Sequence, residues 1–430
     1  MKNIFILSFI FICLSSKGYS TTLYEALKQT YNDNTQLNAE RENFKASEED
    51  INISKAEYKP SLTLSGSKSI EETNKLTNQS GGDTTINDVD PFTTSIKLEQ
   101  TLLDFDRGIS HERNIIGLDL ASAKLIKKEQ DIFYEAIEAY TQLILARETL
   151  DINNSNLDLL SRQVENDKIR LDRGQITITD LSQSESSFAG ARAQFIEAKN
   201  MLLIAKLTYE NVIGEINDPN SLKKELSAIV NTPKSLNDAI SISKRKNPDI
   251  LIAKFEFNQT EKDLESSKAD LKPTAALSLE RSYSEDVSSI IDKREKDTLT
   301  TTLSWPFYSG GKKRSTINKN ANLTSRKRLL LDDTIQTNET NVTSAWSSLE
   351  SSRSFLNSVK VQVKAAKIAN EGIVAEYERG SRTTLDVIQS NALLLSAQIS
   401  LASSERNYLL SQYDLLKSVG LLNSEYLKLK

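Results

Sequence analysis

"SKAEYKPSLTLSGS" (54–67) and "SKADLKPTAALSLE" (267–280) are two versions of one segment, and their repetition decides the fold. The same spacing pairs Leu23 with Leu236 near the start of each copy. Similar segments at a fixed spacing are typical of a chain built from repeated structural units. We therefore predict that the chain contains two copies of one plan.

A second pair of similar segments lies further along each copy. "RLDRG" (170–174) matches "EYERG" (376–380), and the match continues without a gap to Gly214 and Gly420. Each copy is predicted to run helix, strand, loop, strand, long helix, break, long helix. The predicted boundaries are 21–225 for the first repeat, with a β-hairpin at 61–105 and a helical tip near 174, and 226–430 for the second, with a β-hairpin at 274–309 and a tip near 380.

The predicted β-hairpins are apolar on one side and polar on the other. Pro60 and Pro273 end the preceding helices, because proline disfavours helix in the residue before it and cannot continue one itself. Each hairpin could cover a helix of its own chain, or it could face lipid. The strands have about the 9–11 residues that cross a bilayer when tilted. Since four strands cannot close a barrel and lipid tolerates no open sheet edge, the lipid alternative requires several copies of the chain.

The long helices carry apolar residues at alternating steps of three and four, which predicts antiparallel coiled-coil packing. In the last helix, the predicted seam comprises Leu385, Ile388, Ala392, Leu395, Ile399, Ala402, Leu409, Tyr413 and Leu416. In the equivalent helix of the first repeat, it comprises Phe188, Phe195, Leu202 and Tyr209.

Residues 1–20 are expected to be a secretory signal peptide rather than part of the fold. Lys2 precedes the apolar run "IFILSFIFICL" (4–14), and Gly18 and Ser20 are spaced as a cleavage site. An N-terminal membrane anchor is the alternative. Because the one cysteine of the sequence lies in this run, the exported chain would contain no disulfide.

The composition argues against an enzyme and against a nucleic-acid-binding protein. Only 14 glycines and 7 prolines interrupt 430 residues, which favours long helices with thin cores. The net charge of −5 lacks the basic excess that nucleic acid requires. The single histidine, His111, is expected to be solvated in the first turn of a long helix, so we expect no catalytic centre, metal site or cofactor.

The repeated plan resembles the TolC-type outer-membrane channels of Gram-negative bacteria. "WPFYSGGKKRS" (305–315) and the long segment "YERGSRTTLDVIQSNALLLSAQISLASSERNYLLSQYDLLKSVGLL" (377–422) carry the resemblance most clearly. The resemblance implies a homotrimer whose copies each give four strands to one twelve-stranded barrel among the outer-membrane lipids. A long helical tunnel would continue through the periplasm. Such channels export small molecules or proteins with a periplasmic adaptor (membrane fusion) protein and an inner-membrane ABC or proton-driven transporter.

The resemblance also implies roles for residues around the two tips. Adaptor docking would fall on Gly174, Gln175, Gly380 and Ser381. The contacts that close the resting entrance would involve Asp180, Tyr377 and Arg382. The constriction that selects ions would be lined by Asp386 and Gln389, and the glutamine replaces an acidic residue that the family leads us to expect.

Two functions from different classes remain at this point. One is the trimeric export channel, and the other is a soluble periplasmic coiled-coil adaptor of a transport complex. An adaptor would gather several short strands in compact β-domains, whereas this sequence alternates hairpins with long helices in both halves. The glycine at each tip is expected to adopt the positive φ that ends a helix, with Thr383 or Thr384 capping the next one.

Overall fold

The computed structural model describes residues 21–72, 74–75, 77, 79–82, 89–216, 218–228, 230–288 and 291–429. The predicted signal peptide at 1–20 lies outside these residues, as does part of the polar loop of the first hairpin. No helix in these ranges is both long enough and apolar enough to span a membrane.

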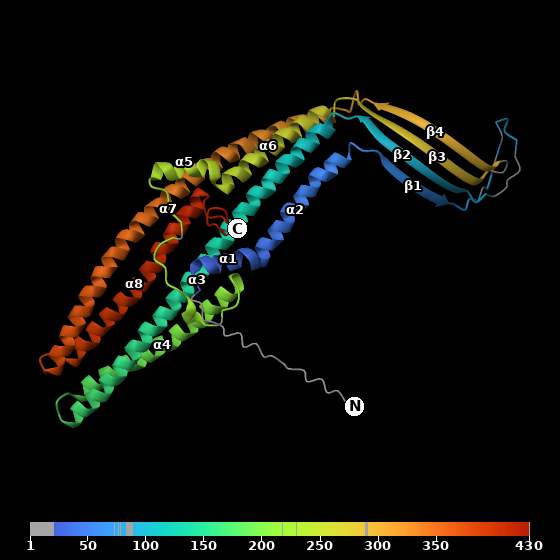
Figure 1. Ribbon diagram of the computed structural model, residues 1–430. Coiled ribbons are helices and arrows are strands. Elements are labelled where there is room, and N and C mark those ends of the chain that lie inside the picture. Colours follow the sequence, from blue (N-terminus) through green and yellow to red (C-terminus); the bar gives the residue numbers. More distant parts are fainter. Residues whose placement is uncertain are drawn as a thin grey trace, which may run out of the picture. The chain divides into compact units, whose positions relative to one another are not determined.

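The described elements follow one order twice, as the colours of Figure 1 trace. They are α1 (Leu23–Asp33), α2 (Thr35–Ala56), β1 (Ser61–Lys68), β2 (Phe92–Leu103), α3 (Asp106–Asp172) and α4 (Ile178–Val212), then a short 3-10 helix (Pro219–Ser221), then α5 (Leu236–Lys246), α6 (Pro248–Ala269), β3 (Thr274–Ser288), β4 (Ile291–Ser304), α7 (Lys312–Glu378) and α8 (Thr384–Val419). The predictions of a mainly helical fold and of two internal repeats are confirmed.

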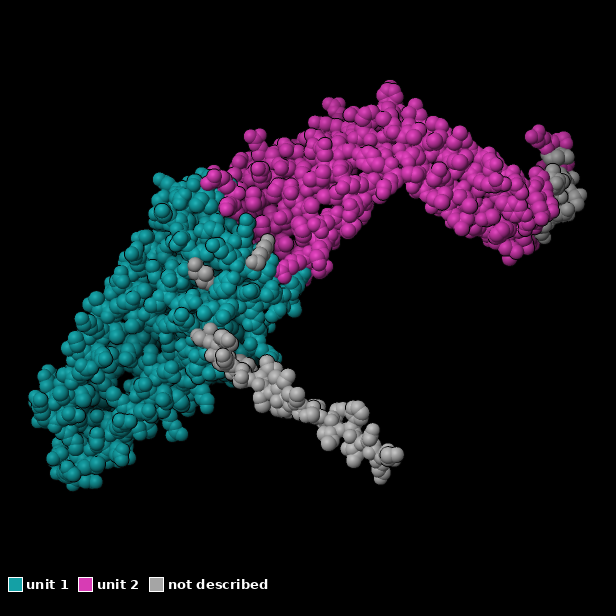
Figure 2. Space-filling view, in the orientation of Figure 1, with its two compact units in different colours: residues 1–38, 128–244, 339–430 teal, residues 39–127, 245–338 magenta. Residues whose placement is uncertain are grey.

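The chain divides into two compact units, coloured separately in Figure 2. Residues 39–127 and 245–338 form the unit that holds the sheet. Residues up to 38, 128–244 and 339–430 form the other unit, which holds the apolar core and both helical tips. Each half of the sequence contributes to both units, because the chain passes from one unit to the other inside α2, α3, α5 and α7.

The sheet contains four antiparallel strands in the order β1-β2-β3-β4. Its register aligns Leu62 with Leu98, Leu98 with Leu279, and Leu279 with Leu299. Because side chains alternate across a strand, these leucines form a row on one face, while the neighbouring positions place serine, threonine and charged residues on the other. Leu62 and Leu299 are 70% and 68% exposed. Each hairpin is therefore amphipathic as predicted, and the apolar face of the sheet is open.

Helices end before the two prolines, as predicted. The helix α2 ends at Ala56 and β1 begins at Ser61, just after Pro60. In the second repeat, α6 ends at Ala269 and β3 begins at Thr274, just after Pro273. Proline therefore marks the change from helix to strand in both copies.

The apolar core lies where the first helix of each repeat meets α3, α4, α7 and α8. Its largest fully buried side chains are Tyr140, Tyr209 and Tyr413. The Tyr140 hydroxyl lies 2.9 Å and 2.7 Å from the carbonyl oxygens of Thr21 and Lys223. Burial raises the pKa of Tyr209 to about 12. These rings give a thin helical core the volume that aliphatic side chains alone would not supply.

The predicted seams are only partly buried. In α4 the seam is correct: Phe188 and Phe195 are half-buried and Tyr209 is fully buried, with buried alanines between them. In α8 the seam is buried from Ala402 onward and half-buried at Ile388, Leu395 and Ile399, whereas Leu385 near the tip is 45% exposed. There α8 contacts α7 through small polar residues, and Nδ2 of Asn370 donates to Oδ1 of Asn391 at 2.6 Å.

The expectation for His111 was wrong. The residue lies in the second turn of α3, and its Nδ1 is 2.7 Å from the Oγ of Ser54, a side chain that is almost fully buried in α2. The histidine thus joins two helices instead of projecting into solvent.

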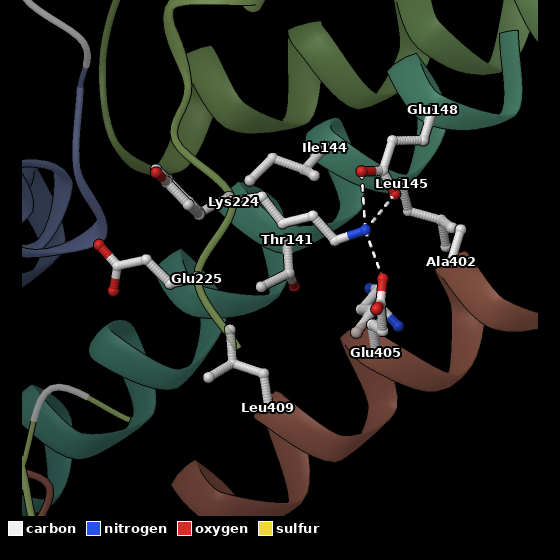
Figure 3. A pocket seen from close by; sticks show the side chains of 11 residues that line it. Thr141, Ile144, Leu145, Glu148, Lys224, Glu225, Ala402, Glu405 and Leu409 are labelled. Atoms are coloured by element: carbon white, nitrogen blue, oxygen red, sulfur yellow. Dashed lines mark hydrogen bonds and ion pairs between the residues drawn. The ribbon is translucent and has the colours of Figure 1, made fainter. Parts of the chain in front are cut away.

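One lysine in the connection between the repeats forms ion pairs with helices of both repeats. Lys224 lies between α4 and α5, and its ammonium group contacts Glu148 of α3 at 2.7 Å and Glu405 of α8 at 2.5 Å (Figure 3). Burial opposes the charge, but the hydrogen bonds to both carboxylates outweigh it and raise the pKa of Lys224. A segment without regular structure therefore links a helix of the first repeat to a helix of the second.

Candidate functional site at the helical tips

Two tight turns join the long helices in pairs, α3 to α4 and α7 to α8. Gly174 and Gly380 adopt φ of 68° and 79°, as predicted. The amide of Gln175 donates to the carbonyl of Arg170 at 2.9 Å, and the amide of Ser381 donates to the carbonyl of Glu376 at 3.0 Å. This pattern closes the end of a helix around a left-handed residue, which glycine adopts without steric cost.

The helix after each turn begins with the same cap. The Thr383 amide donates to the Asp386 carboxylate at 3.0 Å, and the Asp386 amide donates to the Thr383 hydroxyl at 3.2 Å. Thr177 and Asp180 form the same reciprocal pair at the start of α4. The backbone hydrogen bond from the threonine is the main reason that the pKa of each aspartate is lowered. Of the two threonines predicted as caps, Thr383 has this role.

Tyr377 lies in a buried polar cluster that the sequence did not reveal. Its hydroxyl donates to Oδ1 of Asp167 at 2.6 Å and lies 3.3 Å from the hydroxyl of Thr384. The Ser184 hydroxyl donates to Oδ2 of Asp167 at 2.5 Å, and the Gln163 amide contacts both carboxyl oxygens at 3.1 Å. The side chain of Asp167 is fully buried.

This cluster joins all four tip helices. Asp167 comes from α3, Ser184 from α4, Tyr377 from α7 and Thr384 from α8. The guanidinium of Arg170 lies 4.4 Å from the centre of the Tyr377 ring, a distance at which a cation is attracted to the ring face. Burial and the hydrogen bond to Asp167 raise the pKa of Tyr377. The cluster therefore connects the two helical hairpins of one chain near their ends.

The other residues expected at the entrance make separate contacts within the chain. Arg382 pairs with Glu376 at 2.7 Å, across its own turn. The Asp180 carboxylate accepts hydrogen bonds from the amide and the hydroxyl of Thr177, whereas the Tyr377 hydroxyl donates to Asp167. Asp386 and Gln389 are three positions apart on α8, so both lie on one face of that helix. Gln389 is exposed and Asp386 is half-exposed.

The four expected docking residues, Gly174, Gln175, Gly380 and Ser381, are exposed. Between the two tips lies an open groove of about 670 Å³. Its lining includes Arg170, Arg173 and Arg379, against a single carboxylate, that of Glu378. The lining of this groove is therefore mainly polar and basic.

One signal in the sequence could have identified Asp167. The buried face of α3 follows Leu160 and Val164, and Asp167 occupies the next position at the same three-and-four spacing. A carboxylate at an apolar position of a seam needs hydrogen-bond partners when it is buried. Two of its partners, Ser184 and Tyr377, lie on other helices, α4 and α7, so the sequence alone could not name them.

Comparison with known proteins places the chain among transport proteins. The sequence model of the outer membrane efflux protein family matches residues 26–215 and 239–421. The chain belongs to this family. The two matched segments fall one in each repeat, and membership decides for an outer-membrane channel over a soluble adaptor.

Individual relatives agree over most of their length. The chain is 27% identical to the outer membrane efflux protein BepC of Brucella suis over 417 residues, which cover 96% of this chain and 88% of BepC. It is 22% identical to the alkaline protease secretion protein AprF of Pseudomonas aeruginosa, over 80% of this chain and 72% of AprF. Its fold matches the CmeC outer membrane channel of Campylobacter jejuni with a TM-score of 0.79 at 14% identity, over 93% of this chain and 86% of CmeC.

Proposed function

We propose that three copies of this chain form a channel through which small molecules or proteins leave the cell across the outer membrane. The observation that carries the proposal is the open leucine row of the sheet, from Leu62 to Leu299, on a sheet whose edge strands are β1 and β4. An apolar face and free edges are unfavourable in water. Lipid would cover the face, and the edges of neighbouring copies would pair, so that three sheets close into one twelve-stranded barrel.

The helices would continue the passage into the periplasm. Several large apolar side chains on α4 are exposed in one chain, among them Ile196, Leu203, Ile204 and Leu207. An apolar stripe of this kind fits the contact between copies in a helical assembly. We assign these residues to the interface of the trimer.

The tips would form the inner entrance. We propose that Tyr377, Asp180 and Arg382 hold the entrance closed, with Asp167 as an additional member of this set, because it fixes Tyr377 between the two hairpins. Three copies of Asp386 would form a ring that attracts cations, and Gln389 would leave this ring without a second carboxylate beside it. A periplasmic adaptor would dock at Gly174, Gln175, Gly380 and Ser381 and would connect the channel to an inner-membrane ABC or proton-driven transporter.

The test is reconstitution. The full chain, purified in detergent, should have the mass of a trimer and should produce discrete conductance steps in a planar bilayer. Recovery of the chain as a monomer from a soluble periplasmic extract would contradict the proposal, and so would a purified trimer without conductance.

A further inference from the structure

At the end of the sheet that adjoins the helices, the chain passes four times between a helix and a strand, and contacts join each of these four passages to the next. Arg107 donates to the carbonyl oxygens of Glu57 and Thr101 and lies 4.7 Å from the ring centre of Tyr58, which joins the first passage to the second. The Nζ of Lys272 lies 4.5 Å from the ring centre of Phe105, which joins the second to the third.

The third and fourth passages are joined in the same way. The Trp305 indole donates to the carbonyl of Leu271 at 3.1 Å, and Lys313 donates to the carbonyl of Asp270. We call this band of residues, 55–59, 104–107, 270–272 and 305–314, the junction belt. In Figure 1 it lies where β1, β2, β3 and β4 meet α2, α3, α6 and α7.

The junction belt exposes aromatic rings directly beside the apolar face of the sheet. Trp305, Phe307 and Tyr308 are 62%, 89% and 86% exposed. Tryptophan and tyrosine concentrate at the level of lipid headgroups, because their rings have a polar group on an apolar body, and this applies to Trp305 and Tyr308. Three exposed rings in four residues are costly in water, so this position favours a lipid surface.

The junction belt is also basic, although the chain as a whole carries a net charge of −5. Its basic residues are Lys55, Lys59, Arg107, Lys272, Lys312, Lys313 and Arg314, and its acidic residues are Glu57, Asp104, Asp106 and Asp270. Lys59, Lys312 and Arg314 are exposed, and none of the ion pairs found among the described residues involves them. Their positive charge is available to an outside partner.

The opposite end of the sheet differs in this respect. There Lys293 contacts Glu285 at 3.3 Å and Arg281 contacts Glu295 at 3.4 Å. The basic side chains of Lys293 and Arg281 at that end are thus paired with carboxylates on the neighbouring strand, unlike Lys59, Lys312 and Arg314.

We propose that the junction belt binds the headgroup phosphates of anionic phospholipids in the leaflet that faces the helices. This inference rests on the proposed function, since it requires the sheet to lie in a membrane. Lys59, Lys312 and Arg314 supply the cations, and Trp305, Phe307 and Tyr308 hold the belt at headgroup depth. Long basic side chains reach the phosphates while their stems stay along the apolar surface. Each cation at a lipid surface strengthens binding about fivefold.

Trp305 provides the measurement, because it is one of two tryptophans and lies within the belt. The full chain with Trp346→Phe is reconstituted in phosphatidylcholine vesicles that contain increasing fractions of brominated phosphatidylglycerol or brominated phosphatidylcholine. Quenching of Trp305 fluorescence then gives the relative affinity for the two lipids. We expect a clear preference for phosphatidylglycerol, which weakens about ten- to thirtyfold when Lys312→Gln and Arg314→Gln are combined.

The matched control variant combines Lys293→Gln and Arg294→Gln, which removes the same charge from the other end of β4. This variant should keep the preference for phosphatidylglycerol. Equal quenching by both lipids in the parent, or an equal loss of preference in both double variants, would overturn the proposal. Conductance of the same preparation separates this result from the proposed function. A conducting trimer without lipid preference refutes the belt alone, whereas a chain that neither inserts nor conducts refutes both.

Discussion

The hydroxyl of Tyr377 and the carboxyl group of Asp167 are joined at 2.6 Å, although one residue lies on α7 and the other on α3. This hydrogen bond, buried near the tips, ties the two helical hairpins of one chain to each other. A buried carboxyl group that loses a donor costs about 1–3 kcal/mol, so the hairpins should separate more readily without it.

Tyr377→Phe and Asp167→Asn are therefore expected to increase the fraction of time that the channel is open, as measured by single-channel conductance. Tyr426→Phe is the matched control, because it removes a tyrosine hydroxyl that donates to the carbonyl of Asn231, far from the tips in the sequence. Open fractions that match the unmodified channel in both tip variants would exclude Asp167 and Tyr377 from the closing contacts.

The ring of Asp386 should set ion selectivity. Asp386→Asn is expected to lower the cation-to-anion permeability ratio, and Gln389→Glu is expected to raise it by adding a second ring of carboxylates. The reversal potential in a salt gradient measures both effects. The assignment fails if the reversal potential is the same in both variants as in the parent.

The capping bond predicts how this selectivity depends on pH. The hydrogen bond from the Thr383 backbone lowers the pKa of Asp386 below its ordinary value of 3.8. The carboxylate is therefore still mostly charged at pH 3.8. Its charge, and the stability that this charge gives the helix, are lost as the pH falls through the lowered pKa. Thr383→Val removes the hydroxyl that also bonds Asp386, so the loss of selectivity should move to higher pH. A midpoint that does not move would contradict this reasoning.

A side chain at Gly380 should be destabilising because of backbone geometry alone. A Cβ built on Gly380 meets no atom within 4 Å, but its φ of 79° is unfavourable for any residue with a side chain. Gly380→Ala should lower the free energy of unfolding by about 1 kcal/mol. Gly372→Ala, in the interior of α7 with equal space around it, should raise the free energy of unfolding by about 0.5–1 kcal/mol. Thermal unfolding of the two variants checks the difference, and equal shifts would show that the turn does not need glycine.

Lys224 should contribute to stability through its two carboxylate partners. Lys224→Met keeps the length of the side chain but leaves Glu148 and Glu405 without their cation, which should cost roughly 1–3 kcal/mol. Lys244→Met is the control, because its pair with Glu339 is half-exposed. Chemical denaturation measures both, and a smaller loss for Lys224 than for Lys244 would refute its role as a fastening residue.

The leucine row makes a prediction about membrane insertion. Leu299→Arg puts a charge on the apolar face of the sheet and should reduce insertion by about 2–4 kcal/mol near the centre of a bilayer. Thr300→Arg, one residue along and on the opposite face, should insert normally. The amount of each variant recovered in the membrane fraction of the cells measures the difference in insertion. Normal insertion of both variants would remove the lipid-facing assignment of this row.

The sequence by itself determined the elements of this protein and their order. Proline at 60 and 273, glycine at 174 and 380, and alternating leucines in the strands act through local backbone preferences, which neighbouring residues decide. For this reason the two repeats, the hairpins, both tip turns and the Thr383 cap could be predicted.

Only the tertiary structure decided which side chains meet. Asp167 is hydrogen-bonded to Tyr377, Ser184 and Gln163, and two of these three residues lie on other helices. The part of the α8 seam near Leu385 is exposed because α8 meets α7 there through Asn391 and its neighbours. Such contacts depend on the rotation of each helix about its axis, which is set jointly by the packing of several helices, whereas a heptad pattern in one helix specifies only that an apolar face exists.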